Sequence, residues 1–241
     1  MFQAHPLTVV IPAHDEEQTI ESVVREFIDV ECVDRVLVVE NNCKDATAER
    51  ARAAGAEVIE ESEPGYGSAI RAGLDHALAT GADILAITEA DGSFRAKDLW
   101  KMAHYLEDCD MVLGTRTTRQ MVEQGANMDA KMRWGNVTMA KLLELYWFLP
   151  HEPRLTDVGC TYRMLWARSW ERIRVGTRER GPQFSPEMIC EAYRKGLRVI
   201  EIPVHYGERL GGDSKHSASF LHVVRTALGM FRTINRKRFL G

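Results

Sequence analysis

The chain has 241 residues, which is the size of one large α/β domain. Hydrophobic residues make up 45% of it, enough to bury a core, and a formal net charge of -4 argues against a protein that binds nucleic acid. The five cysteines are odd in number and form no Cys-x-x-Cys pair, which argues against a disulfide framework or a zinc site. The sequence shows no signal peptide and no apolar segment near the roughly 20 residues that span a bilayer, so we expect a cytoplasmic protein.

Apolar runs alternate with helical patterns along the chain. The run 7–12 predicts a strand, and residues 16–28 predict a helix because Ile20, Val24 and Phe27 recur at helical spacing. The same alternation predicts, in chain order, a strand over 35–40, a helix over 46–55, a strand over 56–61, a helix over 68–81, and strands over 83–88 and 110–115. Strands that alternate with helices across short loops indicate an α/β fold with a mostly parallel sheet and helices on both faces.

Two carboxylates stand at the end of the fourth predicted strand. Glu89 and Asp91 are two residues apart, and Gly92 follows them directly. On its own, such a pair fits a solvated Asp-Gly turn. Other predicted strands also end in polar stretches, "PAHDEE", "ENN" and "GTR". Because ligands of parallel α/β sheets bind at the carboxyl ends of the strands, the acid pair is a candidate site for a divalent cation.

The stretch "GYGSAIR" follows the third predicted strand. It resembles a dinucleotide-binding fingerprint, but Ile70 occupies the place of the third glycine and the stretch does not follow the first strand, so nicotinamide binding is a poor interpretation. Gly65 and Gly67 instead lead into a helix that carries Arg71. Two interpretations stay open: the N–H groups and Arg71 hold a phosphate, or the segment is a plain turn with a surface arginine.

Residues 220–241 contain five basic residues and no acidic one. Their apolar residues recur at helical spacing, which predicts an amphipathic helix. That helix either docks on the protein with a solvated face or lies at the surface of an anionic membrane. The apolar residues are Phe220, Val224, Ala227, Phe231 and Ile234.

The motifs, in their order along the chain, resemble the family-2 glycosyltransferases of GT-A fold, and most of all their dolichol-phosphate or polyprenyl-phosphate hexosyltransferase branch. They are "VIPAHDEE", "VLVVENNCKDAT", "EPGYGSAIRAGLDHA", "EADGS", "GTR", "TDVGCTYR" and "KGLRVIEIPVHYGERLGGDSK". Glu89 stands where the family usually has the first Asp of Asp-x-Asp, and Glu40-Asn41-Asn42 stands where it usually has Asp-Asp. The resemblance implies a Rossmann-like GT-A catalytic domain over residues 1–219, with 220–241 as a basic amphipathic helix of the same domain.

The resemblance also implies a donor site built around the acid pair. Asp91 would bind Mg²⁺ or Mn²⁺ directly, and Glu89 would reach the metal through water or contact the ribose. The metal would neutralise the diphosphate as it leaves the sugar. The further donor contacts implied are Pro12, Ala13, Asp15, Glu40, Gly67, Arg71 and Ala90.

The loop "GERLGGDSK" is implied to bind the acceptor. Arg209 and Lys215 would hold an acceptor phosphate there, with help from Arg116. A phosphate monoester is already an anion at neutral pH, so it needs no general base. A hydroxyl acceptor does need one, and Asp157 or Glu187 would then supply it.

We therefore expect an inverting, metal-dependent glycosyltransferase. It would move a hexose from a nucleotide-sugar of the GDP-mannose or UDP-glucose type to a polyprenyl or dolichyl phosphate. It would work in the cytoplasm or peripherally on the cytoplasmic face of a membrane. Two alternatives remain: transfer to a hydroxyl of a soluble or lipid acceptor, and a non-catalytic relative that binds a nucleotide-sugar.

Overall fold

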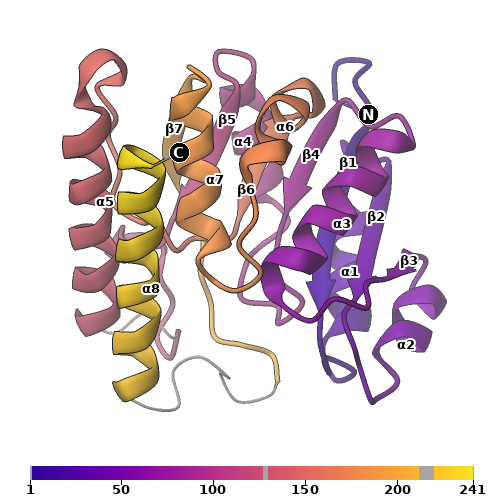
Figure 1. The fold of residues 1–241 in the computed structure, drawn as a ribbon. Coiled ribbons are helices and arrows are strands. Elements are labelled where there is room, and N and C mark those ends of the chain that lie inside the picture. Colours follow the sequence, from indigo (N-terminus) through magenta and orange to yellow (C-terminus); the bar gives the residue numbers. More distant parts are fainter. Residues whose placement is uncertain (1, 127–129, 212–219, 241) are drawn as a thin grey trace.

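The protein, seen in a computed structural model, is built on a seven-stranded sheet (Figure 1). The structure describes residues 2–126, 130–211 and 220–240. The strands run in the order β3-β2-β1-β4-β6-β5-β7. Their bounds are β1 Leu7–Ala13, β2 Arg35–Glu40, β3 Glu57–Glu60, β4 Ile84–Ile87, β5 Met111–Thr115, β6 Arg163–Trp166 and β7 Val199–Pro203.

The sheet is parallel except at one strand. β1 pairs in parallel with both β2 and β4, so that Val10 lies between Leu37 and Ile87. β6 is inserted between β4 and β5 and runs antiparallel to both. The expectation of a mostly parallel sheet is confirmed, and each of the five predicted strands forms within one or two residues of its predicted limits.

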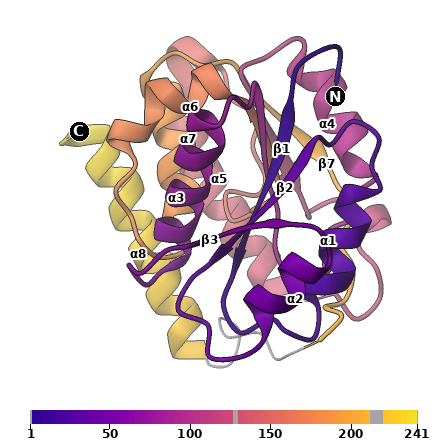
Figure 2. The same ribbon diagram turned by 90° about the vertical axis from the view of Figure 1, so that its right-hand side faces the viewer.

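Helices cover both faces of the sheet, as predicted. Figure 2 shows α1, α2 and α4 on one side of the strands and α3, α6, α7 and α8 on the other. The first layer consists of α1 Ile20–Ile28, α2 Thr47–Ala53 and α4 Asp98–Leu106. The second consists of α3 Tyr66–Ala79, α5 Ala130–His151, α6 Ala167–Ile173, α7 Phe184–Arg194 and α8 Phe220–Phe239, and short 3-10 turns span Arg119–Met121 and Arg174–Gly176.

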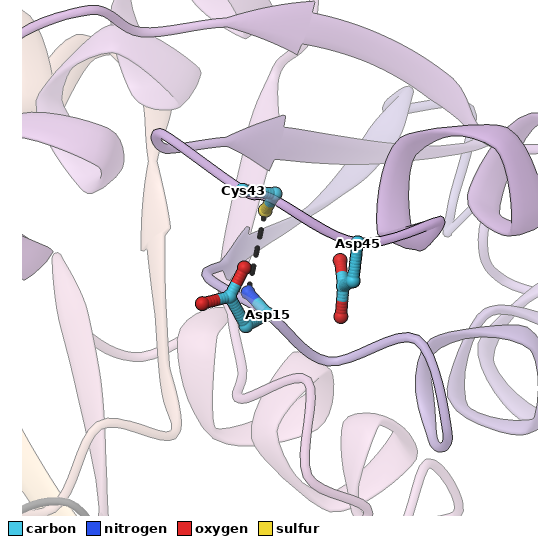
Figure 3. Close-up of side chains that lie close together, drawn as sticks. All are labelled: Asp15, Cys43 and Asp45. Carbon is cyan, nitrogen blue, oxygen red and sulfur yellow. Dashed lines mark hydrogen bonds between the residues drawn. The ribbon is translucent and has the colours of Figure 1, made fainter.

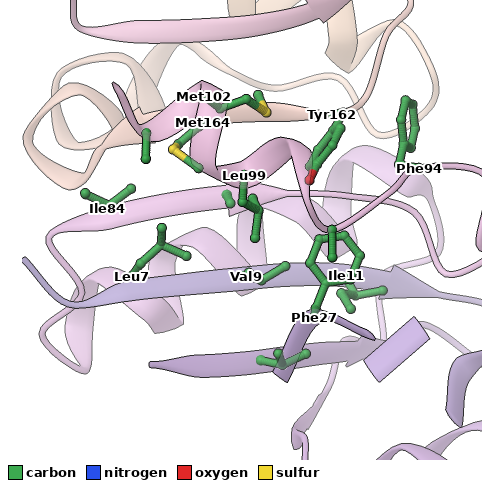
Figure 4. Close-up of a cluster of buried hydrophobic side chains, with 14 of the residues drawn as sticks. Leu7, Val9, Ile11, Phe27, Ile84, Phe94, Leu99, Met102, Tyr162 and Met164 are labelled. Carbon is green, nitrogen blue, oxygen red and sulfur yellow. The ribbon is translucent and has the colours of Figure 1, made fainter. Parts of the chain in front are cut away.

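The alternation of side chains along β1 divides the core into two clusters. Leu7, Val9 and Ile11 face α1 and α4, where they pack with Phe27 and Leu99 (Figure 4). The residues between them point to the opposite face, where α3, α5, α6 and α7 bury their apolar sides. The two-sided burial explains why the strands read as continuous apolar runs in the sequence.

The C-terminal helix departs in part from its predicted amphipathic face. α8 packs against α7 and α5. Ile234 is fully buried, whereas Val224 and Phe231 are exposed. The predicted apolar stripe is therefore divided between the core and the surface. Among the helices that the structure describes, none is both long enough and apolar enough to cross a membrane.

Candidate active site

The acid pair lies in a tight loop directly after β4. Asp91 is only 2% exposed, and its Oδ1 accepts a hydrogen bond from the Ser93 N–H at 2.9 Å. The Thr19 hydroxyl donates to the Ala90 carbonyl at 2.7 Å, which fixes the loop to the start of α1. Gly92 has φ of +73°, a conformation that favours glycine. The loop is therefore held in shape by the rest of the protein.

A second segment crosses over this loop. The N–H of Gly207 donates to the Ser93 carbonyl at 2.8 Å, and that of Leu210 donates to the Asp91 carbonyl at 3.0 Å. The segment places Arg209 Nη2 3.0 Å from Asp91 Oδ2. This contact pairs opposite charges without hydrogen-bond geometry, so among the described residues Asp91 Oδ2 keeps no hydrogen-bond partner.

Glu89 lies beside Asp91 and feels its charge. The Thr161 hydroxyl donates to Glu89 Oε1 at 2.8 Å. Burial, together with the nearby charge of Asp91, raises the pKa of Glu89 to about 7. A recessed carboxylate pair with an unsatisfied oxygen is what a hard divalent cation needs from a protein when phosphates supply its other ligands. Glu89 and Asp91 are therefore suited to hold such a cation.

Two cavities meet at the acid pair, and Tyr66, Glu89 and Arg209 form walls of both. The first, which we call the donor cavity after the substrate expected there, has a volume of about 360 Å³ and lies at the ends of β1, β2 and β4. Its remaining walls are Pro12, Ala13, His14, Glu16, Asn41, Pro64, Gly65, Ala69, Ala90 and Asp91.

Asn41 shapes the donor cavity by holding its outer loop. Its Nδ2 donates to the carbonyls of Glu61 and Glu63, both at 2.8 Å, and its Oδ1 accepts from the Gly65 N–H at 2.9 Å. The predicted "ENN" motif thus acts through its first asparagine, which fixes the turn that leads into α3.

The second cavity, which we call the acceptor cavity after the substrate expected there, has a volume of about 210 Å³ and lies between α5, α7 and α8. Arg116 and Arg209 belong to its lining, and the Arg116 guanidinium stacks 5.2 Å from the centre of the Tyr206 ring. The three helices and the turn before α7 contribute both apolar and polar residues: Met132, Gly135, Asn136, Met139, Pro182, Ser185, Thr226, Ala227 and Met230.

Several residues expected to contact the donor lie outside the lining of both cavities. Among the described residues, Arg71 donates to the Glu179 carbonyl at 3.0 Å and pairs with Glu63 at 3.3 Å. Glu40 accepts from the Cys43 N–H within its own turn. Gly67 packs so tightly that a Cβ there would lie 2.2 Å from the Glu179 carbonyl oxygen.

Asp15 also turns away from the cavity. It lies close to Cys43 and Asp45 (Figure 3), and the potential ligand atoms of the three fall within 4.8 Å of one another. Its carboxylate accepts from the Lys44 N–H at 2.7 Å, and that of Asp45 accepts from the Glu17 and Thr47 N–H groups at 3.1 and 3.0 Å. These contacts clamp two loops together, which accounts for the cluster.

The two candidate general bases are held in buried ion pairs. The Asp157 carboxylate binds Arg116 with two parallel hydrogen bonds, at 2.8 Å from Nε and 3.0 Å from Nη2. Glu187 accepts from two backbone N–H groups at 2.7 Å and lies 2.9 Å from Lys237 Nζ. Lys215, expected to bind the acceptor, lies outside the described residues.

The sequence did not indicate Tyr66 or Tyr206 as site residues. Tyr66 separates the two cavities at the first turn of α3, and burial raises its pKa. The signal for Tyr66 was its place between two turn glycines in "PGYGS", directly after a predicted strand. Tyr206 becomes part of the site because the segment after β7 crosses the loop after β4, where Tyr206 pairs with Phe94.

Comparison with known proteins places the sequence in a family. The model of glycosyl transferase family 2 matches residues 8–167. An uncharacterized glycosyltransferase of Mycobacterium tuberculosis is 34% identical over 95% of this chain and 98% of its own. The undecaprenyl-phosphate mannosyltransferase of Micrococcus luteus is 25% identical over 88% of each chain, and the dolichyl-phosphate hexose transferase of Haloferax volcanii is 28% identical over 85% and 84%.

The fold also has solved counterparts. Glucosyl-3-phosphoglycerate synthase from M. tuberculosis, crystallised with Mn²⁺, UDP and glucosyl-3-phosphoglycerate, superposes with a TM-score of 0.73 at 19% identity over 98% of this chain and 80% of that one. At that identity the likeness shows a shared GT-A fold. Together with the family match over most of the sheet, it leads to one assignment: this chain is a glycosyltransferase and belongs to glycosyl transferase family 2.

Proposed function

We propose that this protein is an inverting, metal-dependent hexosyltransferase that moves a hexose from a nucleotide-sugar of the GDP-mannose or UDP-glucose type to a polyprenyl phosphate. The observation that carries the proposal is the meeting of two cavities at Glu89 and Arg209. The first lies at the strand ends and contains the acid pair, and the second combines Arg116 and Arg209 with apolar residues of α5 and α8. A nucleotide-sugar suits the first, and a lipid phosphate suits the second.

Each residue of this junction has a role in the transfer. Asp91 and Glu89 would hold Mg²⁺ or Mn²⁺, which supplies charge neutralisation for the departing diphosphate. Arg209 would hold the acceptor phosphate near the anomeric carbon, with Lys215 as a second cation. An oxygen of that phosphate forms the new bond to the sugar carbon while the bond to the nucleotide diphosphate breaks on the opposite face, which inverts the configuration.

The ion pairs of the two candidate general bases support a phosphate acceptor. Asp157 and Glu187 are both tied into buried ion pairs, so neither is placed to take a proton. A phosphate acceptor needs no such base. The names of two relatives, an undecaprenyl-phosphate mannosyltransferase and a dolichyl-phosphate hexose transferase, point to the same acceptor class.

An acceptor comparison tests the proposal. Purified protein with Mn²⁺ and a panel of nucleotide-sugars is offered polyprenyl phosphate, the free polyprenol, and phosphoglyceric acid as a soluble acceptor. We expect transfer to the polyprenyl phosphate and its loss with EDTA. Transfer to the polyprenol or to the soluble acceptor alone would support the hydroxyl alternative, and binding of donor without any transfer or hydrolysis would support a non-catalytic relative.

A further inference from the structure

The turn that forms the outer wall of the donor cavity is held from outside the cavity. This turn and the start of α3, residues 63–71, contribute Pro64, Gly65, Tyr66 and Ala69 to the cavity wall. We call these residues the donor loop. Behind the donor loop lies the segment 176–181, whose residues do not contribute to the described lining of the donor cavity.

The segment 176–181 contacts the donor loop through its backbone. The Gly67 N–H donates to the Arg180 carbonyl at 2.6 Å, and Arg71 Nη1 donates to the Glu179 carbonyl at 3.0 Å. The fit leaves no space, since a Cβ on Gly65 would lie 2.4 Å from the Arg180 carbonyl oxygen. Any displacement of these carbonyls must therefore move the donor loop.

The other side of the same segment is held by the last turns of α8. Glu179 Oε1 accepts from the Thr233 hydroxyl at 2.9 Å and from Arg236 Nη2 at 2.7 Å. Lys237 is 7% exposed; its ammonium group donates to the Gly176 carbonyl and lies 2.9 Å from carboxylate oxygens of both Glu187 and Glu191. Breaking such buried pairs is costly, so this end of α8 is firmly attached.

We infer that the end of α8 positions the donor loop, with Glu179 as the link: its side chain binds α8 and its backbone carbonyl binds the donor loop. Arg236 and Thr233 are thus positioning residues for the nucleotide, although neither lines either cavity in the described part of the chain. The same helix lines the acceptor cavity with Thr226, Ala227 and Met230, so one element supports both substrates. The inference rests on the proposed function only in taking the donor cavity as the nucleotide site.

Arginines on α8 provide a matched comparison. Arg236→Met removes the contact with Glu179, and Arg236→Lys keeps its charge. Arg232→Met makes the same chemical change one turn earlier, at an exposed position. Tyr146→Phe removes a 2.8 Å hydrogen bond to Asn235 and so loosens α8 from α5 rather than from Glu179.

The test measures UDP and GDP affinity with Mn²⁺ by calorimetry, well below the melting temperature of each variant. We expect Arg236→Met to weaken binding by about 2- to 30-fold, with substantial recovery in Arg236→Lys and wild-type affinity in Arg232→Met and Tyr146→Phe. Wild-type affinity in Arg236→Met would overturn the inference, as would an equal loss in Arg232→Met.

Hydrogen exchange in the nucleotide-free protein separates this inference from the proposed function. We expect faster exchange across residues 63–71 in Arg236→Met and unchanged exchange there in Arg232→Met. A wild-type protein that binds neither nucleotide would overturn the proposed donor, and the exchange comparison would still decide the positioning. Equal exchange in the two variants would overturn the inference by itself.

Discussion

At the scale of single residues, Asp91 has the largest part in the proposed transfer. Its buried carboxylate has one oxygen satisfied by the Ser93 N–H and one left without a hydrogen bond among the described residues. We expect Asp91→Asn to fold normally but to lose at least about 100-fold in transfer rate, because the leaving diphosphate is no longer neutralised. Transfer assays across a Mn²⁺ titration measure this, with the exposed Asp108→Asn as the control. Wild-type activity in Asp91→Asn would remove Asp91 from the metal site.

The raised pKa of Glu89 gives a second prediction at this scale. Burial and the charge of Asp91 raise the pKa to about 7, so Glu89 carries a proton below that pH and is a carboxylate above it. A cation binds the carboxylate, so the affinity for Mn²⁺ with UDP or GDP should rise between about pH 6 and pH 8. Calorimetry across this range should show a smaller rise in Glu89→Gln. An equal rise in the variant would assign the pH dependence to another group, such as the nucleotide.

What the sequence could indicate at this scale was the type of residue and its place at a strand end. The pattern indicated Glu89 and Asp91, and the family resemblance added Pro12, Ala13 and Ala90; all five line the donor cavity. It could not indicate which charges pair across the fold. Arg209 and Asp91 are far apart in the sequence but form an ion pair in the fold. Arg71 contacts Glu63 and Glu179 because of packing that no local sequence pattern encodes.

At the scale of elements, the ion pair between Arg116 and Asp157 joins the end of β5 to the loop before β6. Asp157 is 1% exposed and accepts the Arg116 backbone N–H as well as its guanidinium. We expect Asp157→Ala to lower the free energy of unfolding by about 3–5 kcal/mol, because it leaves Arg116 buried without a counter-charge. Urea denaturation measures the loss.

The exposed pair of Glu21 and Arg25 on α1 provides the control for that measurement. Glu21→Ala should cost about 0.3–0.5 kcal/mol. If Asp157 instead served as a general base, Asp157→Asn would keep wild-type stability while losing transfer to a hydroxyl acceptor. That combination would contradict the structural role given to Asp157.

The order and type of the first elements followed from periodicity, because β1 to β5 alternate with helices that have clear apolar faces. β6 was not predicted, since "RMLW" is short and its direction depends on where the long α5 returns the chain to the sheet. The acceptor cavity was not predicted for the same reason. It forms where α5, α7 and α8 come together, and no pattern within a single helix encodes that meeting.

At the scale of the whole molecule, the helices next to the acceptor cavity present apolar side chains to solvent. Leu228 and Phe231 of α8 are exposed, as are Leu145 and Phe148 of α5. The exposed arginines of α8 add positive charge. We expect these helices to bind anionic vesicles and so to bring the acceptor cavity to its lipid.

Vesicle flotation with phosphatidylglycerol tests this expectation. Leu228→Ser combined with Phe231→Ser should weaken binding by about tenfold or more, since each apolar side chain contributes about 1.5–3 kcal/mol when buried. Val175→Ser, at a position that is 76% exposed on another element, should bind as the wild type does. Equal binding of all three proteins would place the membrane contact elsewhere.

Phosphorus NMR of the complete reaction distinguishes transfer to a phosphate from transfer to a hydroxyl, because it observes the acceptor phosphate itself. Protein, diamagnetic Mg²⁺, a nucleotide-sugar that stabilises the fold, and polyprenyl phosphate are followed in one sample. We predict that the phosphomonoester resonance of the acceptor is replaced by a phosphodiester resonance at the rate at which nucleotide diphosphate appears, and that Asp91→Asn stops both changes. Release of nucleotide diphosphate with transfer of the sugar to a hydroxyl, while the monoester resonance stays unchanged, would contradict the account.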